Sequence, residues 1–235
     1  MRFRRRIADL RGRGVYQGWP NANRAIFVHI PKTAGSSVAQ ALCASSRHAP
    51  YFEYESTNPR KFNQYFKFSF VRNPWDRFVS TFFFLKKGGM NEMDRRFTAE
   101  NLAGYDNFAA FVEGWLNEKN IWSWIHFKPQ HYFICDAGLR VRMDFVGRVE
   151  SIAADFRYIC ERLGVDAELK WTNSTNHRPY GEYYTDDLRD RVAAVYADDI
   201  RIFGYRFEPA LCLVSQPSGG RSVSCNTVKK SDAQP

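Results

Sequence analysis

The stretch AIFVHIPKTAGSS, residues 25–37, decides the fold class of this chain. Its first six residues are apolar except His29 and end at a proline, which predicts a buried strand over residues 25–30. A short loop with lysine, threonine and glycine follows, and the spacing of apolar residues over 36–45 predicts a helix. A strand that leads through a short loop into a helix is the repeating unit of a parallel α/β sheet.

A second segment, FKFSFVRNPWDRF at residues 66–78, repeats this arrangement. Its apolar run predicts a strand over residues 66–71. Asn73 and Pro74 are typical of a helix N-cap and of the first helical position. The helix is expected to continue to about residue 87, where two glycines end it.

The rest of the chain continues the alternation. Further helices are expected over residues 106–118, 129–134, 150–163 and 185–203, and a third strand over residues 141–146. The pattern predicts the α/β class with a central, mainly parallel sheet flanked by helices. Ligands of such sheets bind beyond the carboxyl ends of the strands, which directs attention to the two turns quoted above.

The charge of the chain is concentrated at its two ends. The 235 residues carry a formal net charge of +9, a balance typical of proteins that bind polyanions. Residues 1–14 have a net charge of +5 and residues 214–235 one of +2, so the segment between them carries only +2. This distribution predicts weak attraction of the N-terminal end to anionic surfaces and no specific binding of nucleic acid.

Composition also suggests where the folded part begins and ends. Residues 1–24 are rich in arginine and glycine and are expected to form a basic, flexible arm. Residues 25–213 are expected to form one domain, followed by a disordered tail at residues 214–235. No run of about 18 apolar residues occurs, so no membrane-spanning helix is expected.

The loop at residues 32–37 has the composition of a phosphate-binding turn. A lysine supplies positive charge, two serines supply hydroxyl groups, and the start of the next helix presents backbone N–H groups. It is not a Walker A motif, because Lys32 precedes Gly35, and no acidic residue is placed to hold Mg²⁺. The loop therefore predicts an anion site without a metal, although a plain strand–helix connection with a solvated lysine fits the same residues.

The turn after residue 71 could bind a second anion. Arg72 lies at a helix N-terminus, where its guanidinium and free N–H groups can share one anion. Ser80 lies four residues after Asp76, on a helix face that leans toward Arg72, so Arg72 and Ser80 can converge on one phosphate. A well-capped helix with a surface arginine is the alternative, and Arg77 fits a solvated or salt-bridged position.

Together the two turns resemble motifs of the sulfotransferase superfamily, in particular the carbohydrate O-sulfotransferases of the heparan 2-O and chondroitin/dermatan type. HIPKTAGSS resembles the 5′-phosphosulfate loop of that family, and FVRNPWDRFVSTF resembles its 3′-phosphate element. Lys128-Pro129-Gln130 and residues 144–156, 173–176 and 183–207 extend the resemblance, which covers about residues 25–208. It implies a three-layer fold similar to that of the P-loop NTPases.

The resemblance also implies a reaction and its site. The donor would be 3′-phosphoadenosine 5′-phosphosulfate (PAPS), and the sulfuryl group would move in line to a hydroxyl, with no metal required. Lys32 would stabilise the leaving group. The 5′-phosphosulfate would be held by Lys32, Thr33, Ala34, Gly35, Ser36 and Ser37. The 3′-phosphate would be held by Arg72 and Ser80. Arg148 could contact either anion, or else pair with Glu150.

The acceptor hydroxyl needs a general base. The resemblance to the heparan 2-O type points to His48, whose ordinary pKa of about 6.5 suits the role. A surface histidine in a loop is the alternative reading of the same residue. Glu53 or Glu55 could serve instead, because other members of the family use a glutamate. His29 is expected to be structural.

Other residues are candidates for contacts with the substrates. His126 and His131 flank Pro129-Gln130 and are candidates for lining the acceptor cleft. A polar loop is either a cover over adenosine or a surface turn; it contains Asn173, Ser174 and Asn176. The tryptophans of the middle segment either form a wall for sugar stacking or pack in the core. They are Trp115, Trp122 and Trp124.

Two other functions fit parts of the sequence, namely a P-loop kinase-like phosphotransferase and a basic polyanion-binding module without catalysis. For the sulfotransferase interpretation, the partner is a glycan or another hydroxylated acceptor, whose identity no motif gives. Animal relatives of this type carry an N-terminal membrane anchor. The absence of such a segment here predicts a cytoplasmic enzyme.

Overall fold

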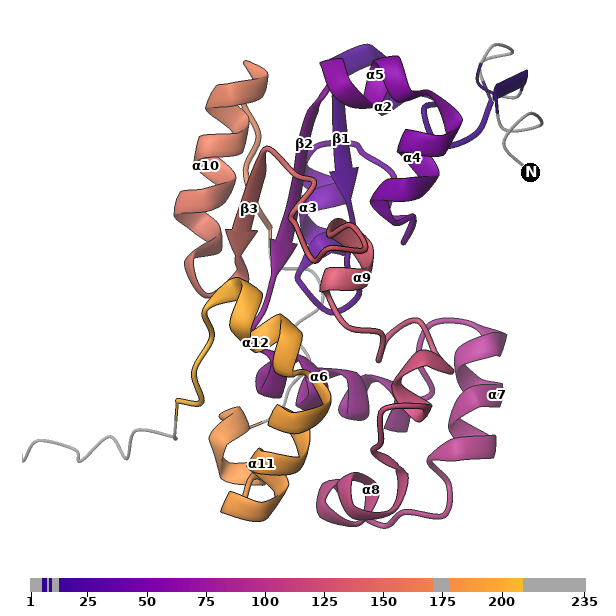
Figure 1. Ribbon diagram of the computed structural model, residues 1–235, viewed down its shortest axis with the longest axis vertical. Coiled ribbons are helices and arrows are strands. Elements are labelled where there is room, and N and C mark those ends of the chain that lie inside the picture. Colours follow the sequence, from indigo (N-terminus) through magenta and orange to yellow (C-terminus); the bar gives the residue numbers. More distant parts are fainter. Residues whose placement is uncertain (1–5, 8, 10–12, 171–177, 209–235) are drawn as a thin grey trace, which may run out of the picture.

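The computed structural model describes residues 6–7, 9, 13–170 and 178–208. Its centre is a three-stranded parallel sheet in the order β1 (Ala25–Val28), β2 (Phe66–Val71) and β3 (Phe145–Arg148). Ala25 pairs with Phe66, and Val71 pairs with Arg148. All three strands therefore end at one edge of the sheet, and in Figure 1 their arrowheads point toward the same group of helices.

Helices cover both faces of the sheet, because successive side chains of a strand point to opposite sides. Phe27, Phe68 and Phe70 pack on one face with residues of α3 (Gly35–Ala41) and α10 (Ile152–Leu163). Ile26, Val28 and Val71 belong to the core of the other face, which contains residues from several helices. These are α4 (Tyr51–Thr57), α5 (Pro59–Gln64) and α9 (His131–Ile134).

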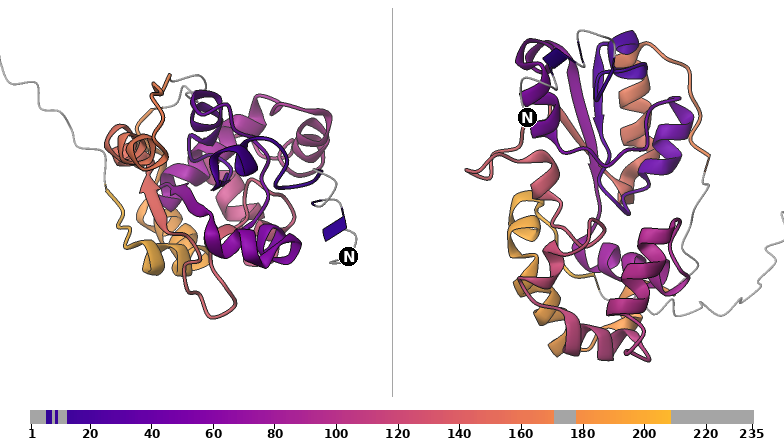
Figure 2. Two further views of the ribbon diagram at one scale, coloured as in Figure 1. Left: turned by 90° about the horizontal axis from the view of Figure 1, so that it is seen from above. Right: turned by 90° about the vertical axis from the view of Figure 1, so that its right-hand side faces the viewer.

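A second group of helices lies beyond the carboxyl ends of the strands (Figures 1 and 2). Its central helix is α6 (Pro74–Lys86), which follows β2 directly. Phe78, Phe111, Trp115 and Phe127 form its aromatic core, all of them buried. Around α6 lie α7 (Glu92–Asn101), α8 (Phe108–Trp115), the 3-10 helix η3 (Tyr180–Tyr183), α11 (Asp186–Val195) and α12 (Ala197–Phe203).

The α/β class, the parallel sheet and the flanking helices are as predicted, and some element bounds differ. The third strand lies at residues 145–148, because Asp144 instead anchors the start of β2 by accepting from the N–H of Lys67 at 2.8 Å. The helix expected over residues 185–203 is two helices separated at Tyr196. The helices α4, α5 and α7 were not expected at all.

Part of the segment expected to be a loose arm is packed on the domain. Tyr16 is fully buried between Tyr54 and Tyr65, and its hydroxyl donates to the backbone oxygen of Tyr54 at 3.2 Å. A short helix, α2 (Trp19–Asn23), then leads into β1. The high content of arginine and glycine in this region gave no indication that Tyr16 is a core residue. The tail predicted at residues 214–235 lies outside the described residues.

Among the residues that the structure describes, no helix combines the length and the apolar character needed to cross a bilayer.

A buried arginine holds the helical group to the sheet. Arg77 of α6 is only 2 % exposed, so it is not the solvated or salt-bridged residue expected. Its Nε donates to the backbone oxygen of Pro31 at 3.4 Å. Its Nη2 donates to the backbone oxygens of His126 and Lys128. One guanidinium thus fixes α6, the loop after β1 and the segment at residues 126–128.

We predict that Arg77→Met lowers the free energy of unfolding by about 3 kcal/mol, because buried carbonyl groups lose their donor. Arg95→Met is the matched control. Arg95 pairs with Glu92 on the surface of α7, so its loss should change stability by no more than about 0.5 kcal/mol. Urea unfolding of both variants measures the difference. Equal changes in the free energy of unfolding would show that the hydrogen bonds of Arg77 do not stabilise the fold more than a surface arginine does.

Candidate functional site

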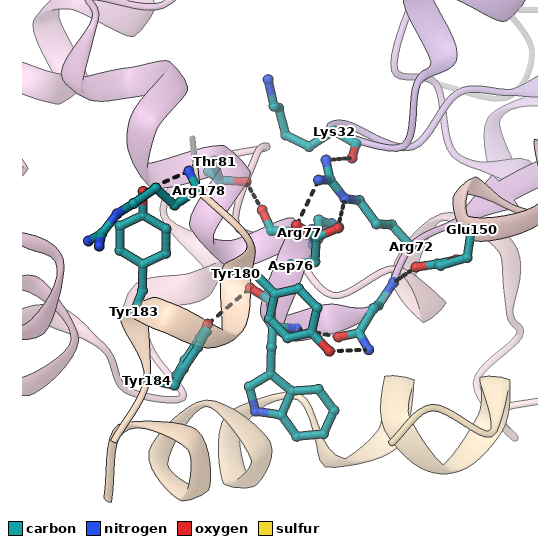
Figure 3. A network of polar contacts seen from close by, with 12 residues as sticks. Lys32, Arg72, Asp76, Arg77, Thr81, Glu150, Arg178, Tyr180, Tyr183 and Tyr184 are labelled. Carbon is teal, nitrogen blue, oxygen red and sulfur yellow. Dashed lines mark hydrogen bonds and ion pairs between the residues drawn. The ribbon is translucent and has the colours of Figure 1, made fainter. Parts of the chain in front are cut away.

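The two turns singled out in the sequence meet at the carboxyl edge of the sheet. One follows β1 and the other follows β2, which is the neighbouring strand. They touch directly, because Arg72 Nη1 donates to the backbone oxygen of Lys32 at 3.4 Å (Figure 3). The side chain of Lys32 extends away from this contact. The structure thus brings together the two cations that the sequence assigned to two anions.

The first turn is shaped by a glycine and a histidine. A Cβ on Gly35 would lie 1.9 Å from the ring of His29, so only glycine allows α3 to begin here. Lys32 and Ala34 adopt positive φ angles of 66° and 57°, which are unusual outside glycine. Thr33 is buried, and its hydroxyl donates to the backbone oxygen of Ile30 at 2.9 Å.

Lys32 places its charge against an aromatic ring. Its Nζ lies 4.1 Å from the ring centroid of Phe84 in α6. Burial, together with the nearby charge of Arg72, lowers the pKa of Lys32 to about 8. The ammonium group is therefore charged at neutral pH but close to losing its proton.

Arg72 is held at both its backbone and its guanidinium. The side-chain amide of Gln130, which is fully buried, accepts from the N–H of Arg72 at 2.9 Å and donates to its carbonyl at 2.8 Å. Asp76 accepts two hydrogen bonds from the guanidinium, each at 2.8 Å. Asp199 in turn accepts from the N–H of Gln130 at 2.6 Å. These bonds explain the Pro-Gln pair, which the sequence marked only as a resemblance.

Ser80 and Arg148 occupy less open positions than the sequence suggested. Ser80 lies on α6 with no exposed surface, so a phosphate would reach it only if the side chains over it moved. Arg148 lies 4.6 Å from the ring centroid of Tyr205 and donates to the backbone oxygen of Phe203. The alternative ion pair with Glu150 does not form, because that carboxylate accepts from the N–H of Asn73 and from the Tyr205 hydroxyl instead.

The histidine at position 48 has the tautomer that a base needs. Its Nδ1 lies 3.0 Å from the backbone oxygen of His29, so Nδ1 carries the proton and the lone pair of the neutral ring is on Nε2. Burial lowers the pKa of His48 to about 4, so the ring is neutral at pH 7. Both rival carboxylates are ion-paired. Glu53 contacts Arg47 at 3.2 Å, and Glu55 contacts Arg142 at 2.7 Å.

Among the other histidines that the structure describes, His29 and His131 are held by the fold, and His126 packs against His48. The ring of His29 is buried, its Nδ1 lies 2.8 Å from the backbone oxygen of Ser46, and burial lowers its pKa to about 3, which fits a structural role. The Nδ1 of His131 lies 2.8 Å from Asp199, so this ring is held in the fold. His126 contacts both His48 and Phe84 through its ring, with centroids 5.8 Å and 4.9 Å away.

His126 is in contact with a carboxylate that the sequence analysis did not identify. Asp94 of α7 is 1 % exposed, and its Oδ1 lies 3.2 Å from His126 Nε2. Residues 87–105 carry no recognisable motif, and the helix that positions Asp94 was not predicted; Asn91, which caps that helix, is the local signal that could have indicated it.

Trp122 is the most exposed of the three tryptophans. Trp115 is buried in the aromatic core, and Trp124 stacks on Phe97 with centroids 4.9 Å apart. Trp122 is 43 % exposed and packs edge-on against Tyr132, which also contacts the 37 % exposed Phe52. We call Phe52, Trp122 and Tyr132 the aromatic ledge. Lys128 Nζ lies 4.7 Å from the ring centroid of Tyr132.

Two further points of the sequence analysis concern the polar loop at residues 173–176 and the binding of a metal. The polar loop with Asn173, Ser174 and Asn176 lies outside the described residues. Within the described ranges, no three His, Cys, Asp or Glu side chains lie close enough together to hold a metal ion.

Comparison with known proteins gives one match. The model of the family described as "Sulfotransferase family" matches residues 21–206, which include both turns, α6 and α12. No curated protein and no solved structure matches the chain.

We predict that Gly35→Ala destabilises the protein by about 2 kcal/mol, because the new methyl group must displace the buried ring of His29. Gly104→Ala is the matched control, since no atom lies within 4 Å of the Cβ it would add. Thermal and urea unfolding of the two variants measure the effect. A Gly35 variant as stable as the control would contradict the close approach of His29.

Proposed function

The chain belongs to the sulfotransferase family, and from this membership we propose that it transfers a sulfuryl group from PAPS to a hydroxyl of a carbohydrate. The single observation that carries the proposal is the contact between Lys32 and Arg72 at the carboxyl edge of the sheet. PAPS carries two separate anionic groups, a 5′-phosphosulfate and a 3′-phosphate, and these two turns offer one cation to each.

The residues of the first turn fit a phosphosulfate. Gly35 lets the start of α3 pack against the ring of His29, and the first N–H groups of a helix have no partner within it. Ser36 is partly exposed at the same helix start. Arg72 is pre-positioned for the 3′-phosphate by the Gln130 amide and by Asp76, which would share its guanidinium with the ligand.

The proposed reaction is an in-line displacement. The acceptor oxygen bonds to sulfur while the bond between sulfur and the bridging oxygen of the 5′-phosphate breaks. Nε2 of His48 takes the proton of the hydroxyl, and Lys32 stabilises the negative charge that develops on the released 5′-phosphate. The neutral His48 tautomer and the charged Lys32 at pH 7 support these roles.

The aromatic ledge supports a carbohydrate as the acceptor. Phe52 follows His48 by four residues, at the start of α4, so the ledge begins close to the proposed base. Exposed aromatic faces bind the apolar faces of sugar rings, and Lys128 adds a positive charge beside Tyr132. A charged acceptor, such as an acidic glycan, fits this combination.

Two alternatives remain for experiment to separate. A kinase-like phosphotransferase would bind ATP with Mg²⁺, and a polyanion-binding module would bind without turnover. The match to the sulfotransferase family and the absence of a Walker A order in the loop favour sulfuryl transfer over both.

We predict that the protein transfers labelled sulfate from PAPS to glycans and that Lys32→Ala and Arg72→Ala each lower kcat/KM by about 100-fold or more. The exposed Lys119→Ala and Arg95→Ala are matched controls and should leave the rate unchanged.

In the same series, 3′,5′-ADP should raise the Tm of the wild type, and ATP with Mg²⁺ should not. Stabilisation by ATP with Mg²⁺ alone would overturn the donor assignment, and wild-type turnover in both alanine variants would overturn the site.

We predict that Trp122→Ala raises KM for the glycan about tenfold and leaves KM for PAPS unchanged, because a stacking contact contributes about 1.4 kcal/mol or less. Tyr158→Ala is the control, since Tyr158 is 45 % exposed on α10, away from the ledge. Initial-rate kinetics with each substrate varied distinguish the two constants. An equal effect of both variants would remove the ledge from the acceptor site.

A further inference from the structure

Three buried polar side-chain atoms of the described chain lack a hydrogen bond, and all three belong to one cluster. They are Asp94 Oδ1, Trp124 Nε1 and His126 Nδ1. A buried polar atom without a partner costs about 1–3 kcal/mol, so three of them in one place call for an explanation. The cluster lies beside the proposed reaction centre, since the ring of His126 contacts that of His48.

The chain is built to bury the carboxylate of Asp94. Gly89 has a φ of +64°, and a Cβ there would lie 2.2 Å from the Cβ of Asp94, so only glycine at position 89 lets the chain pass this close to Asp94. Asp94 Oδ2 accepts from the N–H of Met90 at 3.0 Å, and Asn91 caps the N–H of Asp94 at 2.9 Å. The remaining oxygen, Oδ1, is turned to His126 at 3.2 Å.

Asp94 is the anion of a largely cationic neighbourhood. The ring of Phe84 contacts both the Nζ of Lys32, which lies 4.1 Å from its centroid, and the ring of His126, with centroids 4.9 Å apart. The other charged or titratable groups that face Lys32, His48 and His126 from the surrounding elements are Arg72, Arg77 and Lys87, together with His29. Each of these is cationic or neutral.

We propose that Asp94 and His126 form a positioning pair, in which Asp94 Oδ1 faces His126 Nε2 at 3.2 Å and supplies the buried negative charge that faces Lys32 and His48. The inference rests on the proposed sulfuryl transfer. Neither residue needs to touch the reacting atoms, because the pair acts through its charge and through the ring of His126 against His48.

The direction in which the pH profile of kcat/KM shifts depends on the protonation states of Lys32 and His48 that the reaction needs. Lys32 must be charged, so kcat/KM falls as pH rises through its pKa of about 8. His48 must be neutral, so kcat/KM falls as pH drops through its pKa of about 4. The negative charge of Asp94 raises both pKa values, and its removal therefore moves both limbs of the profile to lower pH.

The first test is the pH profile of kcat/KM for Asp94→Asn. Asparagine keeps an oxygen for the N–H of Met90, so the start of α7 is preserved. We expect the alkaline limb to move down by about one pH unit. Glu92→Gln is the matched control. Glu92 lies two residues before Asp94 and carries the same charge, but its side chain is 82 % exposed. The pH profile of this variant should coincide with that of the wild type. An Asp94→Asn profile that coincides with the control overturns the proposal.

The second test does not require activity. Titration of the histidine ring resonances by NMR should give a lower pKa for His126 and for His48 in Asp94→Asn than in the wild type. Unchanged titration of both rings would overturn the pair even if sulfate transfer is confirmed. Conversely, a wild type without sulfate transfer but with these shifts would overturn the proposed function and leave the pair intact.

A third variant, His126→Gln, keeps the charge of Asp94 and removes the ring, and it decides the matter should Asp94→Asn fail to fold. We expect kcat to fall at least fivefold while the alkaline limb stays near that of the wild type. A kcat equal to that of the wild type would overturn the positioning role of His126.

Discussion

A single buried guanidinium joins the parts of the molecule that the proposed chemistry needs together. Arg77 donates to backbone oxygens of the loop after β1 and of the segment at residues 126–128, and it does so from the middle of α6. Its burial lowers its pKa, yet an arginine keeps its charge. The loop that carries Lys32 and the segment that carries His126 therefore share one rigid support.

The charge at the proposed site comes from a few nearby side chains, although the chain as a whole is basic. Its imidazoles are neutral because they are buried, and the rings of His29 and His48 each use Nδ1 to reach a backbone oxygen. Positive charge close to the reaction centre thus comes from lysine and arginine side chains whose positions are fixed. Neutral rings beside fixed cations would let a polyanionic donor and a proton acceptor lie within a small volume.

Features carried by contiguous residues could be predicted from the sequence. The apolar runs of β1 and β2 and the Asn-Pro start of α6 are local signals, and each appears where expected. The contact between the two turns follows from the parallel pairing of neighbouring strands. The pair of Asp94 and His126 could not be predicted, because it joins residues that are 32 positions apart and belong to different segments of the chain. Likewise, nothing local marks Tyr16 as a core residue or Gln130 as the support of Arg72.

The position of Gln130 limits which substitutions the segment at residues 122–131 can accept. The segment from residue 122 to residue 131 carries part of the aromatic ledge and His126, and it also holds the backbone of Arg72 through one amide. A change in the proposed acceptor surface is therefore mechanically linked to the proposed donor site. A graft that exchanges this segment between relatives must carry Gln130 and a counterpart of Asp199 with it, or the backbone of Arg72 loses its support.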